Sequence, residues 1–123
     1  MVSKKRIIIT PEGNIPDLVL DDTTLAFKSD QGLVIFTGCS HTGICSIIRY
    51  ARQVCGEQRI RDVIGGYHLM DDDSAGISLT IKELAALEPA ALHPCHCTSL
   101  AAKIALAQVA PVHEMDVGLK LEY

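Results

Sequence analysis

Aromatic residues are scarce in this sequence, and tryptophan is absent. They make up 4% of the 123 residues, so the aromatic platforms on which single-stranded nucleic acids stack are not expected. Basic residues are also few, with 11 lysines and arginines against 15 aspartates and glutamates and a net charge of -4. Nucleic-acid binding gains much of its free energy from a basic face that releases counterions. We therefore expect no nucleic-acid partner.

Long apolar runs and disulfide frameworks are missing as well. No apolar run approaches the roughly 20 residues of a membrane-spanning helix. The basic start is followed by a short apolar run that ends at Thr10 and Pro11, without the cleavage site of a secretory leader. The five cysteines are an odd number and include no C-x-x-C pair. We expect no membrane partner and a reducing, cytoplasmic location.

The composition is that of one ordinary globular core. Apolar residues make up 48% of a chain whose length suits a single domain over residues 1–123. Short β-type runs at 6–9 and 17–20 flank a turn-rich segment, and residues 24–37 predict a hairpin around Asp30-Gln31-Gly32.

From residue 43 onward, helical and strand patterns alternate. Apolar residues at spacings of three and four predict helices, short apolar runs predict buried strands, and the final run alternates like an edge strand. The expected elements are a helix at 44–55 capped by Gly56, a strand at 60–66, a helix at 77–88, a strand at 91–94, a helix from Thr98 or Ser99 up to Pro111, and a strand within 113–123. The pattern predicts an α/β fold with a mixed sheet and about three helices.

Three histidines follow the predicted strands at equivalent positions. His41, His68 and His96 each come just after an apolar strand and just before a helix, 27 and 28 residues apart. Parallel strands present their carboxyl ends along one edge of a sheet, so the three should converge there. Imidazole is the commonest ligand of divalent transition metals, and three ligands at loop ends form an open site of the catalytic kind. Each histidine alone is more typical of a turn residue.

Other candidate ligands have simpler interpretations. His93 lies three residues before His96 and should face the opposite way on an extended strand, and His113 has no loop context, so we predict structural roles for both. The cysteines beside the histidines, at positions 39, 95 and 97, could form a cysteine–histidine zinc site. Alternation along an extended chain should instead point Cys95 and Cys97 away from a metal held by His96, which favours small buried thiols.

An acidic run at residues 71–73 offers a further candidate site. Its three aspartates could hold a hard cation or a cationic group of a substrate. A charge run in a loop is more often solvated surface, and these residues could also favour the start of the following helix.

Three segments together resemble a known family. GCSHTGI at 38–44, IGGYHL at 64–69 and PCHCT at 94–98 resemble the second half of the metallo-β-lactamase fold superfamily. Within this superfamily, the segments resemble one branch, described as metal-dependent hydrolases of β-lactamase superfamily II. This branch is related to the methanopterin-pathway dihydropterin ribofuranosylaminobenzene phosphate synthase. The resemblance covers about residues 17–123. The DDTTL segment at 21–25 and Ser99 depart from the branch and leave the substrate open.

The resemblance implies a two-metal site, usually of zinc and in some members of iron or manganese, held in an αββα sandwich. It implies that His41 is a ligand of one metal and that His96 belongs to the other. His68 stands where a bridging carboxylate is usual, and a neutral imidazole does not bridge in that way. His68 is therefore expected to ligate one metal or to act as a catalytic proton donor beside it.

One family signature is absent from the sequence. The His-x-His-x-Asp-His segment of the first half, which supplies most metal ligands, occurs nowhere in these 123 residues. We therefore expect a C-terminal half-domain of a metal-dependent hydrolase, from a split or truncated gene, with little activity alone. A separately encoded N-terminal half or a homo-oligomer would complete the site for a small-molecule substrate, with phosphorylated compounds among the candidates. The alternative is a non-catalytic binding or assembly module, or a small zinc-stabilised domain.

Overall fold

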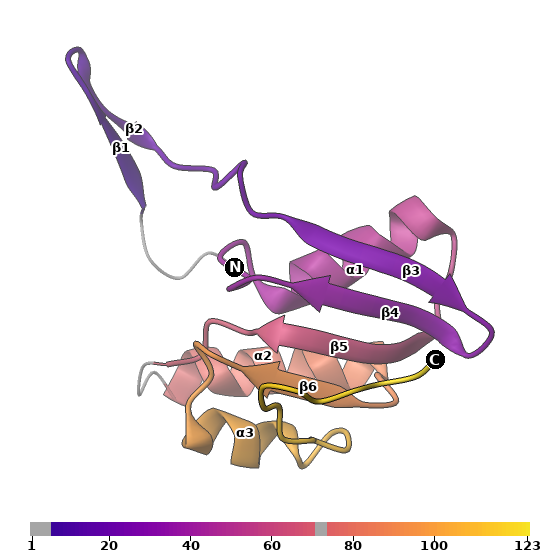
Figure 1. Ribbon diagram of the computed structural model, residues 1–123. Helices are drawn as coiled ribbons and strands as arrows, with labels where there is room; N and C mark the ends of the chain where they lie inside the picture. The colour runs from indigo at the N-terminus through magenta and orange to yellow at the C-terminus, as the bar shows by residue number, and fades with distance from the viewer. Residues whose placement is uncertain (1–5, 71–73) are drawn as a thin grey trace.

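The core of the protein is a four-stranded sheet with helices on one face (Figure 1). The computed structural model describes residues 6–70 and 74–123. The strands lie in the order β3 (Thr24–Ser29), β4 (Gly32–Thr37), β5 (Ile60–Gly66) and β6 (Leu92–Cys95). The β3–β4 pair is antiparallel, whereas β4–β5 and β5–β6 are parallel. This confirms the predicted α/β fold with a mixed sheet.

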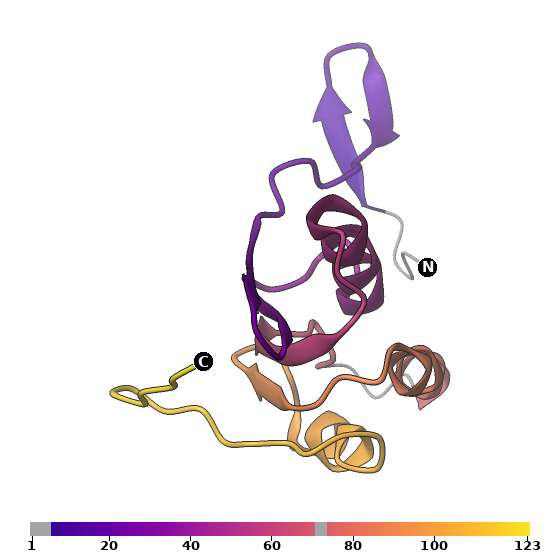
Figure 2. The same cartoon turned by 90° about the vertical axis from the view of Figure 1, so that its right-hand side faces the viewer.

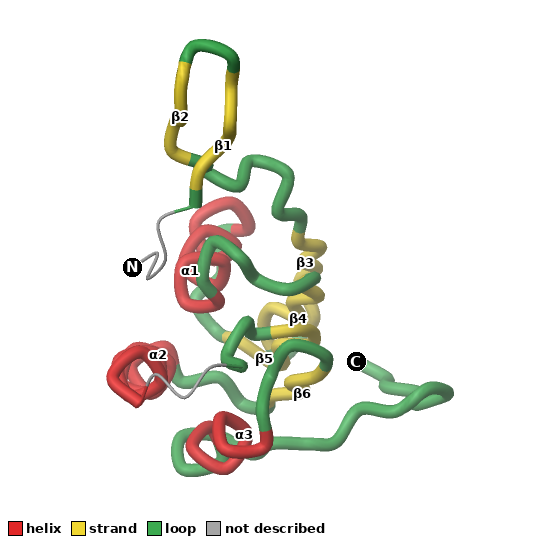
Figure 3. The backbone as a smooth tube through the Cα atoms, turned by 90° about the vertical axis from the view of Figure 1, so that its left-hand side faces the viewer, coloured by secondary structure: helices red, strands yellow, loops and turns green. Residues whose placement is uncertain are grey.

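Three helices cover the same face of this sheet (Figures 2 and 3). They are α1 (Ile44–Cys55), α2 (Ser74–Leu87) and α3 (Leu100–Leu106). Helix α1 ends as expected at Gly56, which adopts a left-handed conformation, and α3 begins after Ser99, whose hydroxyl accepts a hydrogen bond from the Ala102 backbone N–H. Helix α2 begins three residues before its predicted start.

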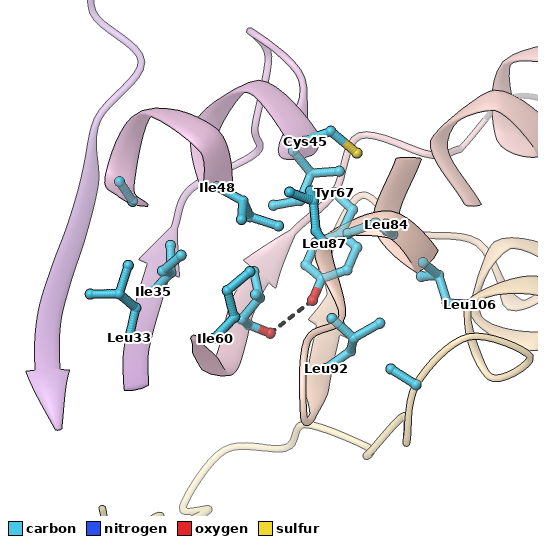
Figure 4. Close-up of a cluster of buried hydrophobic side chains, with 14 residues drawn as sticks. Leu33, Ile35, Cys45, Ile48, Ile60, Tyr67, Leu84, Leu87, Leu92 and Leu106 are labelled. Carbon is cyan, nitrogen blue, oxygen red and sulfur yellow. Dashed lines mark hydrogen bonds between the residues drawn. The ribbon is translucent and has the colours of Figure 1, made fainter. Parts of the chain in front are cut away.

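The buried core lies between the helices and the sheet (Figure 4). Aliphatic side chains dominate it, as the composition indicated. Tyr67 differs from these side chains, because it carries a buried hydroxyl that donates a hydrogen bond to the Val63 carbonyl at 2.8 Å. Burial and the charge of Asp62 raise the pKa of this hydroxyl well above its usual value. The core includes Leu33, Ile35, Ile48, Leu84, Leu87, Leu92 and Leu106.

The opposite face of the sheet is partly open and apolar. Phe27 and Phe36 on this face stack with ring centroids 6.4 Å apart, and Leu25 pairs with Phe36 in the β3–β4 register. The C-terminal tail crosses this side, away from the helices (Figures 2 and 3). Between the tail and the aromatic rings lies a cavity of about 450 Å³. The tail is held at its end by Tyr123, whose hydroxyl donates to the buried carboxylate of Asp62.

Two sequence predictions of strands are wrong. The N-terminal hairpin pairs β1 (Ile7–Thr10) with β2 (Gly13–Pro16), so the second strand occupies the segment predicted as a turn. Residues 17–20 are instead bent by Asp17, whose side chain accepts the Val19 backbone N–H, with Val19 at φ 53°. The alternating run at 113–123 forms no strand in the structure, because the chain leaves β6 after an isolated bridge between Leu92 and Val112 and then crosses the open face of the sheet.

Two other expectations concern a membrane-spanning helix and the acidic run. Within 6–70 and 74–123, no helix is long and apolar enough to cross a membrane. The acidic run at residues 71–73 lies outside the described residues.

Candidate functional site

The predicted histidines lie in the three loops that follow β4, β5 and β6. Since these strands are parallel, their carboxyl ends meet at one edge of the sheet. In the register, Thr37 at the end of β4 pairs with Gly65 of β5, and Gly66 pairs with Cys95 at the end of β6. The loops at 38–43, 67–70 and 96–99 therefore start side by side.

Gly66 is the point at which the first two loops are joined. Its backbone N–H donates to the Gly38 carbonyl at 2.8 Å, and its carbonyl accepts the buried hydroxyl of Ser40 at 2.6 Å. A Cβ atom at this position would lie 2.9 Å from the Gly38 carbonyl oxygen and 2.6 Å from Cys97 Sγ. Only glycine lets the loops approach so closely, which explains why the sequence places a glycine pair at the end of this strand.

The loops after β5 and β6 are joined in the same way. The Leu69 backbone N–H donates to the Cys97 carbonyl, and the Ser99 N–H donates to the Leu69 carbonyl, each at 2.9 Å. The Thr98 hydroxyl accepts a hydrogen bond from the Tyr67 N–H at 3.1 Å. These bonds fix the backbone on both sides of His68 and His96.

His41 and His68 lie against each other at this edge. Their ring centroids are 4.9 Å apart, and the rings are perpendicular. Both side chains are exposed, and His68 has a φ of 53°, a left-handed conformation that is uncommon for a residue with a side chain. Two of the three histidines predicted to converge are therefore in contact.

Arg6 reaches this histidine pair from the N-terminal hairpin. A terminal guanidinium nitrogen of Arg6 lies 3.1 Å from His68 Nε2. A guanidinium can only donate, so Nε2 must accept and the neutral ring carries its proton on Nδ1. For His68 to bind a metal through Nε2, Arg6 would have to move away.

His96 lies at the end of β6 on the same edge, with an exposed side chain and a φ of 51°. In the described part of the chain, no three His, Cys, Asp or Glu side chains are arranged to hold a metal ion. A catalytic zinc usually has three protein ligands. The donors at this edge therefore do not form a complete metal site by themselves, and the roles of His41, His68 and His96 as ligands stay predictions.

Sequence reasoning missed two residues that shape this edge. The Asp22 carboxylate accepts hydrogen bonds from the Thr42 N–H at 2.9 Å and from the Thr42 hydroxyl at 2.8 Å, which fixes the chain next to His41. The other is Arg6. Asp22 lies in the DDTTL segment, which stood out only as a departure from the resembling branch, and both residues act across a distance in sequence that no local pattern reveals.

His93 lies on the opposite face of the sheet from the core and is buried. It pairs with Ile64 in the register, and its Nδ1 lies 2.8 and 2.9 Å from the two oxygens of the buried Asp62 carboxylate. His113 stacks on it with ring centroids 4.9 Å apart. These contacts support the structural interpretation of His93 and His113.

The thiol of Cys97 lies between the loops at this edge, and its expected orientation away from a metal held by His96 stays a prediction. Its Sγ lies 3.3 Å from the His68 backbone N–H and 3.5 Å from the Cys39 carbonyl oxygen, between the loops. Strict alternation fails here because His96 adopts a left-handed conformation and the chain is not extended. Burial raises the pKa of the Cys97 thiol.

Comparison with known proteins relates this fold to that of a metal-dependent hydrolase. No family model matches the sequence. The crystal structure of Tm1679, a metal-dependent hydrolase of the β-lactamase superfamily, matches 95% of the chain with a TM-score of 0.83 and 32% identity. The match covers 46% of that hydrolase. The chain is therefore similar, over nearly its whole length, to part of a β-lactamase-superfamily hydrolase, and it matches a partial domain of that fold.

Two curated relatives come from Methanocaldococcus jannaschii. One is the 7,8-dihydropterin-6-methyl-4-(β-D-ribofuranosyl)-aminobenzene-5'-phosphate synthase, 39% identical over 87 residues, which cover 71% of this chain and 30% of the synthase. The other is an uncharacterized protein, 28% identical over 95 residues, with 77% of this chain and 34% of that protein covered. The chain thus spans about a third of the length of these relatives.

Proposed function

We propose that this chain supplies part of the active site of a metal-dependent hydrolase and needs further residues to complete it. The observation that carries the proposal is the contact between His41 and His68 at the carboxyl edge of the sheet, in a chain that matches a metal-dependent hydrolase over 46% of that hydrolase. His41, His68 and His96 are the proposed ligands of a divalent metal, with zinc the first to be tested. The remaining ligands come from a complementary polypeptide with the His-x-His-x-Asp-His segment, or from a second copy of this chain.

The open face of the sheet supports the need for a complementary polypeptide or a second copy of this chain. Leu25 and Phe27 of β3 and Phe36 of β4 are exposed on it, although they are large apolar side chains. Exposed apolar patches of this kind on a folded protein are typical of interaction surfaces. An apolar covering layer would bury these rings and would bring its own residues to the edge where the histidines lie.

The experiment mixes the 123-residue chain with a candidate complementary polypeptide. Zinc binding is measured by calorimetry, and hydrolysis is measured on a panel of phosphodiesters and other esters. We expect activity and tight zinc binding in the mixture or in an oligomer of the chain, and little of either in the monomer. Full turnover by the monomer with two tightly bound metal ions would contradict the proposal.

A second candidate is a non-catalytic module that has kept the fold. It is favoured by the lack of a three-ligand group among the described residues. Removing metal with a chelator separates the two candidate functions. A metal that binds only the folded state raises the melting temperature of the protein, so its removal lowers that temperature. A large drop in melting temperature with chelator, without hydrolysis before or after chelation, indicates a structural metal, whereas loss of hydrolysis on chelation indicates a catalytic metal.

A further inference from the structure

The thiol of Cys97 meets the backbone of Cys39, which belongs to a separate loop, beside Gly66. A Cβ atom at Gly66 would lie 2.6 Å from Cys97 Sγ and 3.2 Å from Cys39 Cα, so both cysteines border the same small space. Cys97 Sγ also lies 3.5 Å from the Cys39 carbonyl oxygen. A disulfide requires its two cysteines to be close neighbours, whatever their separation in the sequence, and these contacts place the two residues side by side.

From this geometry we propose that Cys39 and Cys97 are a redox modification site, which a peroxide oxidises to an intramolecular disulfide. All five cysteines are free thiols in the structure. The bond would join the loop that carries His41 to the loop that carries His96. The proposal goes beyond the hydrolase function, because it requires neither a metal nor a complementary polypeptide.

The chemistry balances with hydrogen peroxide as the oxidant. One thiolate attacks a peroxide oxygen, the O–O bond breaks, and a sulfenic acid forms as hydroxide leaves and takes up a proton to become water. The second thiol loses its proton and attacks the sulfenic sulfur, which forms the S–S bond and releases the second water. The two sulfurs lose two electrons, and the peroxide gains them.

The surroundings allow the small movement that bond formation needs. A Cβ atom at Gly38, next to Cys39, would have no heavy atom within 4 Å, so the chain has open space there. Both cysteines are half-buried, and the peroxide is a small molecule. Cys45, by contrast, is buried against α2, where its thiol faces the Thr80 carbonyl at 3.8 Å. Cys45 is therefore not expected to form this bond.

The test treats the reduced 123-residue chain with hydrogen peroxide after metal has been removed by chelation. We expect the intact mass of the monomer to fall by about 2 Da, the loss of two hydrogen atoms, and peptide fragmentation to locate the bond between positions 39 and 97. Cys39→Ser and Cys97→Ser should each lose the crosslink. The matched variants Cys95→Ser and Cys55→Ser should keep it.

The same treatment in urea provides the folding control. If the native contact directs the reaction, unfolded chains should give mixed pairings, and circular dichroism should show that the serine variants are folded. The proposal is overturned if the native protein yields another pair, only intermolecular disulfides, or only sulfinic acids without a crosslink. It is also overturned if Cys95→Ser abolishes the crosslink as Cys97→Ser does.

Discussion

Arg6 holds the imidazole of His68 through a hydrogen bond between two residues that are 62 positions apart in the sequence. The guanidinium nitrogen and Nε2 are separated by 3.1 Å. The bond ties the N-terminal hairpin to the edge of the sheet where the candidate ligands lie. It also sets which ring nitrogen of His68 accepts and which one carries the proton of the neutral ring.

The first prediction concerns the tautomer of His68. In the wild-type protein the neutral ring should carry its proton on Nδ1, because Arg6 donates to Nε2. Arg6→Met should remove this preference, and nitrogen chemical shifts of the imidazole measured by NMR would show it. Arg61→Met is the control, since Arg61 lies over the Tyr123 ring on a different part of the molecule, 5.8 Å from its centroid. An unchanged tautomer in Arg6→Met would contradict the assigned contact.

Gly66→Ala should destabilise the protein by about 1 to 3 kcal/mol, the usual cost of inserting a methyl group where there is no space. The added carbon would meet the Gly38 carbonyl oxygen at 2.9 Å and Cys97 Sγ at 2.6 Å. Gly38→Ala is the matched control, with no atom within 4 Å of the new carbon and an expected change under about 0.5 kcal/mol. Urea denaturation measures the free energy of unfolding of each variant. Equal free energies for Gly66→Ala and Gly38→Ala would count against the close packing at Gly66.

Stability above pH 9 should depend on Cys45. Burial, and after it the charge of Glu83, raises the pKa of this thiol from 9.0 to about 12. The unfolded chain ionises first as the pH rises, so the stabilisation is fully present below pH 9 and is lost between about pH 9 and 12. Free energies of unfolding of wild type and Cys45→Ala, measured across this range, should show a flatter pH dependence for the variant. Parallel curves would show that Cys45 ionises equally in both states.

We expect a complementary polypeptide, or a second copy of the chain, to bind at the open apolar face of the sheet. Phe36→Lys places a charge on that face, and we expect it to weaken association with a complementary polypeptide, or of the chain with itself, by at least about tenfold. Phe36 is 36% exposed, so the monomer should still fold. Tyr50→Lys on α1 is the control, because Tyr50 is 66% exposed on the helix side. Analytical sedimentation would measure the association affinity of both variants. An equal loss of affinity in the two variants would place the interface elsewhere.

Much of the fold could be predicted because its signals are local. The 24–37 hairpin, the helix capped by Gly56 and the strand at 60–66 each follow from turn residues and apolar periodicity within one short segment. The strand predicted within 113–123 is absent because the chain leaves β6 after the bridge between Leu92 and Val112, and alternation in the sequence does not show how far a segment stays paired.

The candidate site was less predictable because its contacts are long-range. The common position of His41 and His68 after parallel strands correctly indicated that they lie together. The position of Cys97 could not be obtained from alternation, since it depends on the left-handed conformation of His96. The contacts of Arg6 and Asp22 depend on how the hairpin and the strand order bring distant segments to one edge.

The most direct test of the account is a zinc titration of the chain alone and in complex with a complementary polypeptide. The account predicts weak binding by the monomer, tight binding by the complex, and a loss of about tenfold or more in the complex for His41→Ala. His113→Ala is the matched control and should bind as wild type does, because His113 stacks on His93. Tight binding of two zinc ions by the monomer, with full hydrolytic turnover, would contradict the central claim.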